Sequence, residues 1–204
     1  NPEGPGLIEE DIESDFSGVY PSRRQTTNLG SYVRVPSNNS FNPSGGFTLG
    51  ATIWPTKITI NDQCIISQFN SAQDAGMALF VGPKGASIVV ADGQNNLIRL
   101  SIDRPLSERR WYHIWASFDL GSSKLEICQT PVIDSFDLDS PLRKEISCST
   151  KPILIPQQPL IIGAAGNNKI TNFFNGKIER PFFINTAIND IDALDIAKGA
   201  TDTR

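Results

Sequence analysis

From Tyr32 onward, the chain consists of short runs of β-branched and aromatic residues, separated by Gly, Pro, Asn and Asp about every ten residues. This spacing is typical of antiparallel sandwiches and barrels. The run Phe47–Trp54 alternates apolar residues with Thr48 and Thr52, so one face packs inward and the other meets solvent. The sequence Gly82-Pro83-Lys84-Gly85 suits a hairpin turn. The sequence therefore predicts an all-β, antiparallel two-sheet jelly-roll sandwich.

The runs and their spacing also predict individual elements. The expected strands are Tyr32–Val35, Phe47–Trp54, Cys64–Phe69, Met77–Val81, Ser87–Ala91, Leu97–Ile102, Trp111–Phe118, Lys124–Gln129, Leu160–Gly163 and Lys177–Ile184, with another near Glu145–Ser149. Helical spacing favours one short helix over Ile188–Lys198, with Asn189 as its N-cap. The expected core residues are Ile53, Ile114, Ala116, Phe118, Ile127, Ile162 and Ile178.

Length and composition indicate one globular domain with an extension. The chain has 204 residues, 39% of them hydrophobic, and a net charge of −4. Residues 1–31 are acidic and rich in Gly and Pro, with too few apolar side chains to form a core, so we expect an extended arm. Residues 32–204 form the expected sandwich. The stretch Pro131–Pro159 has little periodicity and predicts a long loop.

Charge and cysteine content narrow the classes of partner and compartment. The mild acidity disfavours nucleic acid, and the chain lacks the run of about eighteen apolar residues that a membrane helix needs. No signal peptide is recognisable, which favours a cytoplasmic protein. The cysteines lack zinc-site spacing and His113 is the only histidine. Two states remain open: three buried thiols, or one bridge between Cys128 and Cys148.

One hairpin carries a family resemblance. The sequence Trp111-Tyr-His-Ile-Trp-Ala-Ser-Phe-Asp119, the turn at Gly121 and the strand Lys124–Cys128 resemble the signature hairpin of laminin-G-like, concanavalin A-like domains. The stretch from Phe174 to Asn185 is similar to the closing strand of that family. This resemblance implies a sandwich over most of Tyr32–Lys198.

A narrower resemblance involves the N-terminal motifs. The segments Asn1-Pro-Glu-Gly-Pro-Gly6, Gly30–Pro36, Ile53-Trp-Pro-Thr56 and Trp111–Ala116 resemble the laminin-G-like region of the N,N-dimethylformamidase large (β) subunit family. In that family, iron-dependent amide hydrolysis belongs to a later domain, whose Tyr, Tyr and Glu ligands have no counterpart that maps onto this chain. The resemblance therefore implies an accessory or assembly module of an amide-hydrolysing enzyme subunit.

No set of residues predicts catalysis by this chain on its own. The segment Glu9-Glu-Asp-Ile-Glu13 resembles a glucanase motif, but charged Glu10 stands where a catalytic strand needs a core residue. A lone His113 needs a nucleophile or an orienting carboxylate to act as a base. We therefore expect no catalytic residue and no cofactor.

The candidate contact residues are aromatic or lie beside aromatic residues: Trp115, His113, Trp54 and Tyr112. Such residues suit a protein interface within an enzyme assembly, or alternatively a sugar site. Strand alternation turns Trp115 outward, where a partner, the arm or the Pro131–Pro159 loop would cover it. Calcium is the metal that loops at the rim of such a sandwich could bind, with Asp74, Asp92 and Asp119 as weak candidate ligands.

Overall fold

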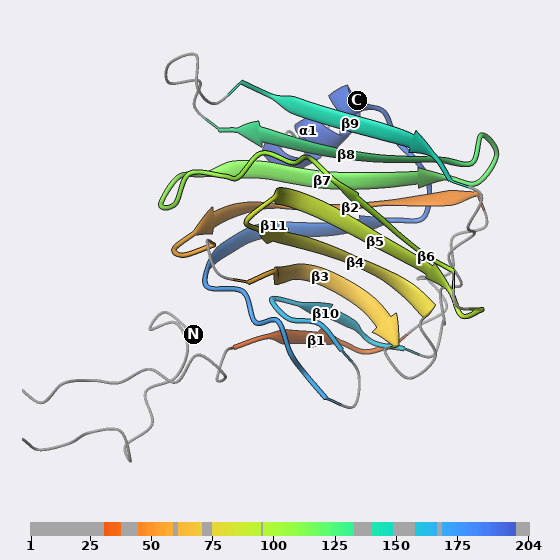
Figure 1. Ribbon diagram of the computed structural model, residues 1–204, viewed down its shortest axis with the longest axis horizontal. Helices are drawn as coiled ribbons and strands as arrows, with labels where there is room; N and C mark the ends of the chain where they lie inside the picture. Colours follow the sequence, from red (N-terminus) through yellow and green to blue (C-terminus); the bar gives the residue numbers. More distant parts are fainter. Residues whose placement is uncertain are drawn as a thin grey trace, which may run out of the picture.

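The computed structural model describes residues 31–37, 45–58, 61–70, 75–94, 96–132, 140–148, 158–166 and 169–198. Within these ranges the strands form two antiparallel sheets packed face to face (Figure 1). The six-stranded sheet has the order β1 (Val33–Val35), β10 (Leu160–Ile162), β3 (Gln63–Asn70), β4 (Ala75–Gly82), β5 (Gly85–Asp92) and β6 (Leu97–Ser101). The five-stranded sheet has the order β11 (Gly176–Ile184), β2 (Gly46–Pro55), β7 (Tyr112–Asp119), β8 (Lys124–Pro131) and β9 (Leu142–Ser147).

The expected sandwich is confirmed, and each expected strand overlaps an observed one. The strand expected near Glu145–Ser149 is β9, which begins earlier, at Leu142. The expected helix is α1 (Asp190–Lys198), which lies against the outer face of the five-stranded sheet (Figure 1). The arm, apart from Ser31, and most of the Pro131–Pro159 loop lie outside the described residues.

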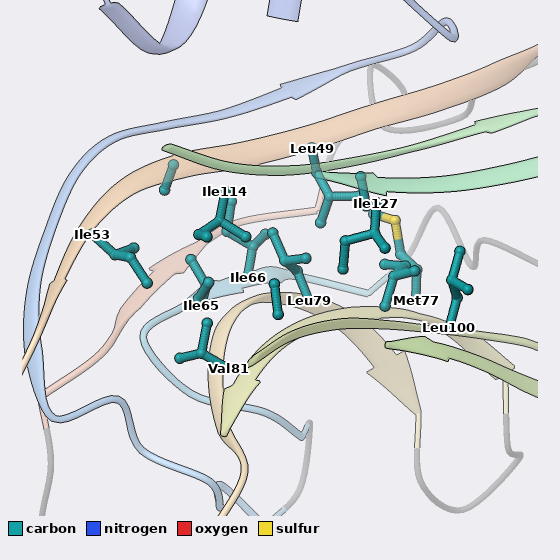
Figure 2. Packing of buried hydrophobic residues seen from close by; sticks show 14 of the residues in the cluster. Leu49, Ile53, Ile65, Ile66, Met77, Leu79, Val81, Leu100, Ile114 and Ile127 are labelled. Atoms are coloured by element: carbon teal, nitrogen blue, oxygen red, sulfur yellow. The ribbon is translucent and has the colours of Figure 1, made fainter. Parts of the chain in front are cut away.

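The core lies between the two sheets. Alternation directs Leu49, Ile53, Ile114 and Ile127 from the five-stranded sheet toward Leu79 and its neighbours in the other sheet (Figure 2). Burying one such aliphatic side chain contributes about 1.5–3 kcal/mol. Of the expected core residues, Ile53, Ile114, Ala116, Phe118 and Ile127 are at most 1% exposed. Ile162 and Ile178 pack against this core but are only half-buried, because β10 and β11 lie toward the sheet margins.

Turn chemistry fixes the hairpin between β4 and β5. Gly82 and Gly85 are paired across the turn, as the sequence predicts. Gly85 has a φ of 77°, and a Cβ atom there would lie 2.0 Å from the carbonyl oxygen of Arg104. Only glycine fits this position without a shift of the backbone.

Candidate functional site

The outer face of the five-stranded sheet gathers three of the four candidate contact residues. Thr52, His113 and Thr130 lie opposite one another on β2, β7 and β8, and Gly50, Trp115 and Cys128 form the next outward row. The remaining candidate, Tyr112, is 1% exposed and lies in the core with Ile114. Its hydroxyl accepts a hydrogen bond from the Ser107 backbone N–H at 3.0 Å. The structure therefore places Tyr112 away from the surface that a partner contact needs.

His113 is buried on this outer face. Its Nδ1 lies 2.8 Å from Thr52 Oγ1, and the residue is 5% exposed. The hydrogen bond fixes the imidazole against the sheet. In this position His113 is a buried part of the outer face, and its ring is not presented to solvent.

Trp115 points outward, as predicted, but the chain itself covers it. The indole is 1% exposed and packs with Cys128, Phe182, Ile188 and Ala193. Ala193 lies on α1 and Ile188 just before it. Within the described part of the chain, the C-terminal helix and the segment before it cover Trp115. The arm and most of the Pro131–Pro159 loop, the covers expected from the sequence, lie outside the described residues.

A β-bulge in β11 brings Phe182 to this cluster. Lys177 pairs with Trp54 and Glu179 with Thr52, but the register then shifts, so that Phe182 lies opposite Gly50. Arg180 has a φ of 48° within the bulge. The extra residue turns Phe182 outward and leaves Phe183 facing the core, where its ring stacks on Phe47 at 6.3 Å.

Helix α1 is held at its start by side-chain hydrogen bonds. Asn189 Oδ1 accepts from the Asp192 N–H at 3.0 Å, which confirms the expected N-cap. Thr48 Oγ1 donates to the Thr186 carbonyl at 2.8 Å and accepts from the Ile188 N–H at 3.1 Å. These bonds anchor the segment before the helix to β2, so Ala193 meets Trp115.

A ladder of charges occupies the side of this face on β8 and β9. Lys124 Nζ lies 2.6 Å from Glu145 Oε2 and 3.6 Å from Glu126 Oε2, and Arg143 pairs with both carboxylates. Lys124 holds the pKa of Glu145 below its ordinary value, and Glu145 raises the pKa of Lys124. The Glu126 side chain is only 7% exposed, so this ladder neutralises a buried carboxylate.

We call the opposite end of the face the open end, because its two tryptophans are only half-buried. Trp54 is half-buried, and the Lys177 ammonium lies 5.1 Å from the centre of its ring. Trp111, also half-buried, immediately precedes β7, and its carbonyl accepts from the Val132 N–H at 2.9 Å. Both tryptophans therefore lie at one end of β2 and β7, and Trp111 was not among the candidate contact residues. Alternation along the sequence from Trp111 to Trp115 puts both side chains on one face, which is the signal that could have identified Trp111.

The calcium candidates act as turn caps where the structure describes them. Asp92 accepts hydrogen bonds from the Asn96 side chain and from the Gln94 and Asn96 backbone N–H groups, which lower its pKa. Asp119 accepts from the Ser122 hydroxyl and the Gly121 N–H, which lower its pKa. Asp74 lies outside the described residues. In the part that is described, no three His, Cys, Asp or Glu residues gather as a metal site would require.

The three cysteines are free and buried. Cys128 packs with Trp115 on the outer face, whereas Cys148 belongs to the core between the sheets. The two thiols thus face opposite sides of the sheet, which explains why the bridge considered from the sequence does not form. Burial raises the pKa of the Cys64 thiol far above its ordinary value.

Among the described helices, none is long and apolar enough to cross a bilayer.

Sequence comparison relates the chain to a known family and to two curated enzymes. Residues 26–191 match the Laminin_G_3 model of the concanavalin A-like lectin/glucanases superfamily. The chain is 29% identical over 214 residues to an N,N-dimethylformamidase beta subunit from Alcaligenes sp, and 28% identical over 215 residues to one from Paracoccus aminophilus. Each alignment covers 98% of this chain but 28% of the relative's length.

Solved structures share the fold at low sequence identity. The LG1-3 region of the laminin alpha2 chain superposes with a TM-score of 0.59 and 10% identity, covering 79% of this chain and 31% of that one. The CBM40 domain of a Ruminococcus gnavus sialidase, bound to sialyllactose, gives 0.60 and 12%, covering 82% and 96% of the two chains. At these identities the likeness establishes the sandwich fold alone.

Proposed function

We infer the role from the family: the chain belongs to the concanavalin A-like lectin/glucanases superfamily, and we propose that it is a non-catalytic assembly module of an amide-hydrolysing enzyme subunit. The observation that carries this proposal is the extent of the two alignments. They account for 98% of this chain with only 28% of a dimethylformamidase beta subunit. The chain thus corresponds to one region of a larger enzyme subunit, which suits an accessory role.

The arrangement of the sheet supports a contact role rather than chemistry. On the outer face, Trp115 is enclosed by the chain's own helix, whereas Trp54 and Trp111 remain half-buried at the open end. Half-buried tryptophan offers a large apolar area at little entropic cost, which is why it recurs at the centres of protein interfaces. We propose that this open end contacts other domains or subunits of the same enzyme.

A chimera tests the assembly role. In the Paracoccus aminophilus subunit, the region that aligns with this chain is replaced by the chain itself, and the control is the same subunit with the region deleted. We expect the chimera to assemble and hydrolyse N,N-dimethylformamide, and the deleted subunit to lose stability and assembly. Adding this chain in trans to the deleted subunit is a second route to restoration. A chimera and a mixture that both perform no better than the deletion would contradict the proposal.

The isolated chain offers a direct check of the non-catalytic part. We expect no hydrolysis of N,N-dimethylformamide or laminarin above the buffer rate. Turnover by purified protein that is abolished by a single change such as Glu13→Gln would sink this part of the proposal.

Carbohydrate binding is the second candidate, because exposed aromatic rings also stack on sugar faces. The half-buried Trp54 and Trp111 are the observation that favours it. A glycan array followed by titration calorimetry tests it, and binding lost on Trp54→Ala would support it over the assembly role.

We propose that the protein acts in a reducing compartment such as the cytoplasm. The support for this proposal is that Cys64, Cys128 and Cys148 are all free thiols.

A further inference from the structure

The open end of the five-stranded sheet combines tryptophan with positive charge. We call Trp54, Trp111, Arg109, Arg110 and Lys177 the basic tryptophan patch. Trp54 pairs with Lys177 across β2 and β11, and the Arg109 N–H donates to the Pro55 carbonyl at 2.7 Å, which ties the arginine pair to the end of β2. Arg109 has a φ of 61°, so the chain bends sharply just before Trp111.

The charge at this end opposes that of the whole chain. Arg109, Arg110 and Lys177 are exposed, as is nearby Lys57. In the part of the chain that the structure describes, two carboxylates lie among them, Glu108 and Glu179, and Glu108 Oε1 accepts from the Ile58 backbone N–H at 3.1 Å. The described residues at this end therefore carry a net positive charge, on a chain whose net charge is −4. A positive patch of this kind attracts and orients a negatively charged partner.

We propose that the basic tryptophan patch docks a carboxylate-rich segment of a partner protein, an inference that rests on the assembly role proposed above. The two indoles provide the apolar floor, and Lys177, Arg109 and Arg110 pair with the partner's carboxylates. Arg and Trp are the residue types that most often dominate the binding free energy of protein interfaces.

Two other ligand classes fit the patch less well. A neutral sugar stacks on an open aromatic face, but the Lys177 ammonium already lies over the Trp54 ring. A nucleic acid is held by many Lys and Arg side chains that each pair with a phosphate, whereas the patch supplies three such side chains. A partner segment with a few carboxylates matches that number of cations.

The test titrates the full chain, labelled with ¹⁵N, with short poly-L-glutamate, a laminarin oligosaccharide and single-stranded DNA. We expect poly-L-glutamate to shift the indole N–H signals of Trp54 and Trp111 but not that of Trp115. The double variant Arg110→Glu/Lys177→Glu should weaken this binding about tenfold or more, and raised salt should weaken it as well. Lys84→Glu removes the same kind of charge at the turn between β4 and β5 and should change the affinity less than about twofold.

Three outcomes would overturn the proposal: absence of any shift with poly-L-glutamate, equal weakening by Lys84→Glu and the double variant, or tighter binding of the sugar or DNA at the same indoles.

The chimera separates this inference from the assembly role. A chimera that assembles equally well with and without Lys177→Glu and Arg110→Glu refutes the acidic partner while the module role stands. If the patch binds poly-L-glutamate but the chimera fails, the assembly role is refuted, whereas the preference of the patch for acidic ligands stands.

Discussion

Trp115 and Trp54 lie on the same face of the same sheet, on neighbouring strands, but their surroundings differ. Trp115 is 1% exposed under α1, Phe182 and Ile188, whereas Trp54 is half-buried with the Lys177 ammonium over its ring. The difference shows that strand alternation determines which face a side chain joins but not what covers that face. A covered tryptophan stabilises the domain, and an open one remains available for contacts.

The largest expected effect is a difference between the two tryptophans in how much each contributes to the free energy of unfolding. Trp115→Ala should lower the free energy of unfolding by about 3–5 kcal/mol, because it leaves a cavity beneath the helix. Trp54→Ala should lower it by less than about 1 kcal/mol, because the side chain is only half-buried. Denaturant titration of both variants provides the measurement. Equal losses at the two positions would break the comparison.

Gly50 tests the close packing under the helix. A Cβ atom there would lie 2.7 Å from Phe182 Cζ and 2.6 Å from the Ile114 carbonyl oxygen. Gly50→Ala should therefore cost about 1–3 kcal/mol through overpacking. Gly45→Ala is the matched control, since an added Cβ meets nothing within 4 Å. If thermal unfolding shifts alike for both variants, Phe182 does not pack over Gly50 as described.

The helix cap has a smaller expected effect. Asn189→Ala removes the acceptor for the Asp192 N–H and should cost about 1 kcal/mol. Asn189→Ser keeps an oxygen acceptor at the N-cap without placing a second carboxylate beside Asp192, and should restore most of the loss. Chemical denaturation followed by tryptophan fluorescence checks both variants. Identical stability for the two would mean that the cap does not hold the helix over Trp115.

The charge ladder should give the smallest effect, with a defined pH dependence. The folded-state pKa of Glu145 lies below its ordinary value of 4.5, so its contribution to stability is present above pH 4.5 and is lost as the pH falls through the lowered folded value. Glu145→Gln should therefore be slightly less stable than the parent near neutral pH, and the difference should fade in acid. A difference that grows below pH 4.5 would contradict the assigned direction.

Most of the fold follows from the local sequence pattern. What covers the outer face of the five-stranded sheet mostly does not. Alternation in Phe47–Trp54 and in the hairpin from Trp111 predicts the strands, the core face and the outward direction of Trp115. It also places Tyr112 beside Ile114 in the core, although its phenol had suggested a surface contact. The side-chain type favoured the surface, whereas strand position determined burial.

The contact between Phe182 and Gly50 was beyond sequence pattern because it depends on a bulge. One extra residue in β11 exchanges the faces of Phe182 and Phe183, and a period-2 pattern contains no signal for that shift. Docking of α1 likewise depends on Thr48, which is far from Ile188 in sequence. The glycine opposite Phe182 was the one available hint of a close approach on the outer face.

Single-tryptophan proteins test the central claim most directly, since the chain contains three tryptophans and all lie at the outer face. In each protein two of them are replaced by phenylalanine, and quenching of the remaining indole by acrylamide is measured. We predict that Trp115 is strongly shielded and that Trp54 and Trp111 are quenched several times more readily, in line with their exposure. Quenching of Trp115 as readily as the other two would contradict the account.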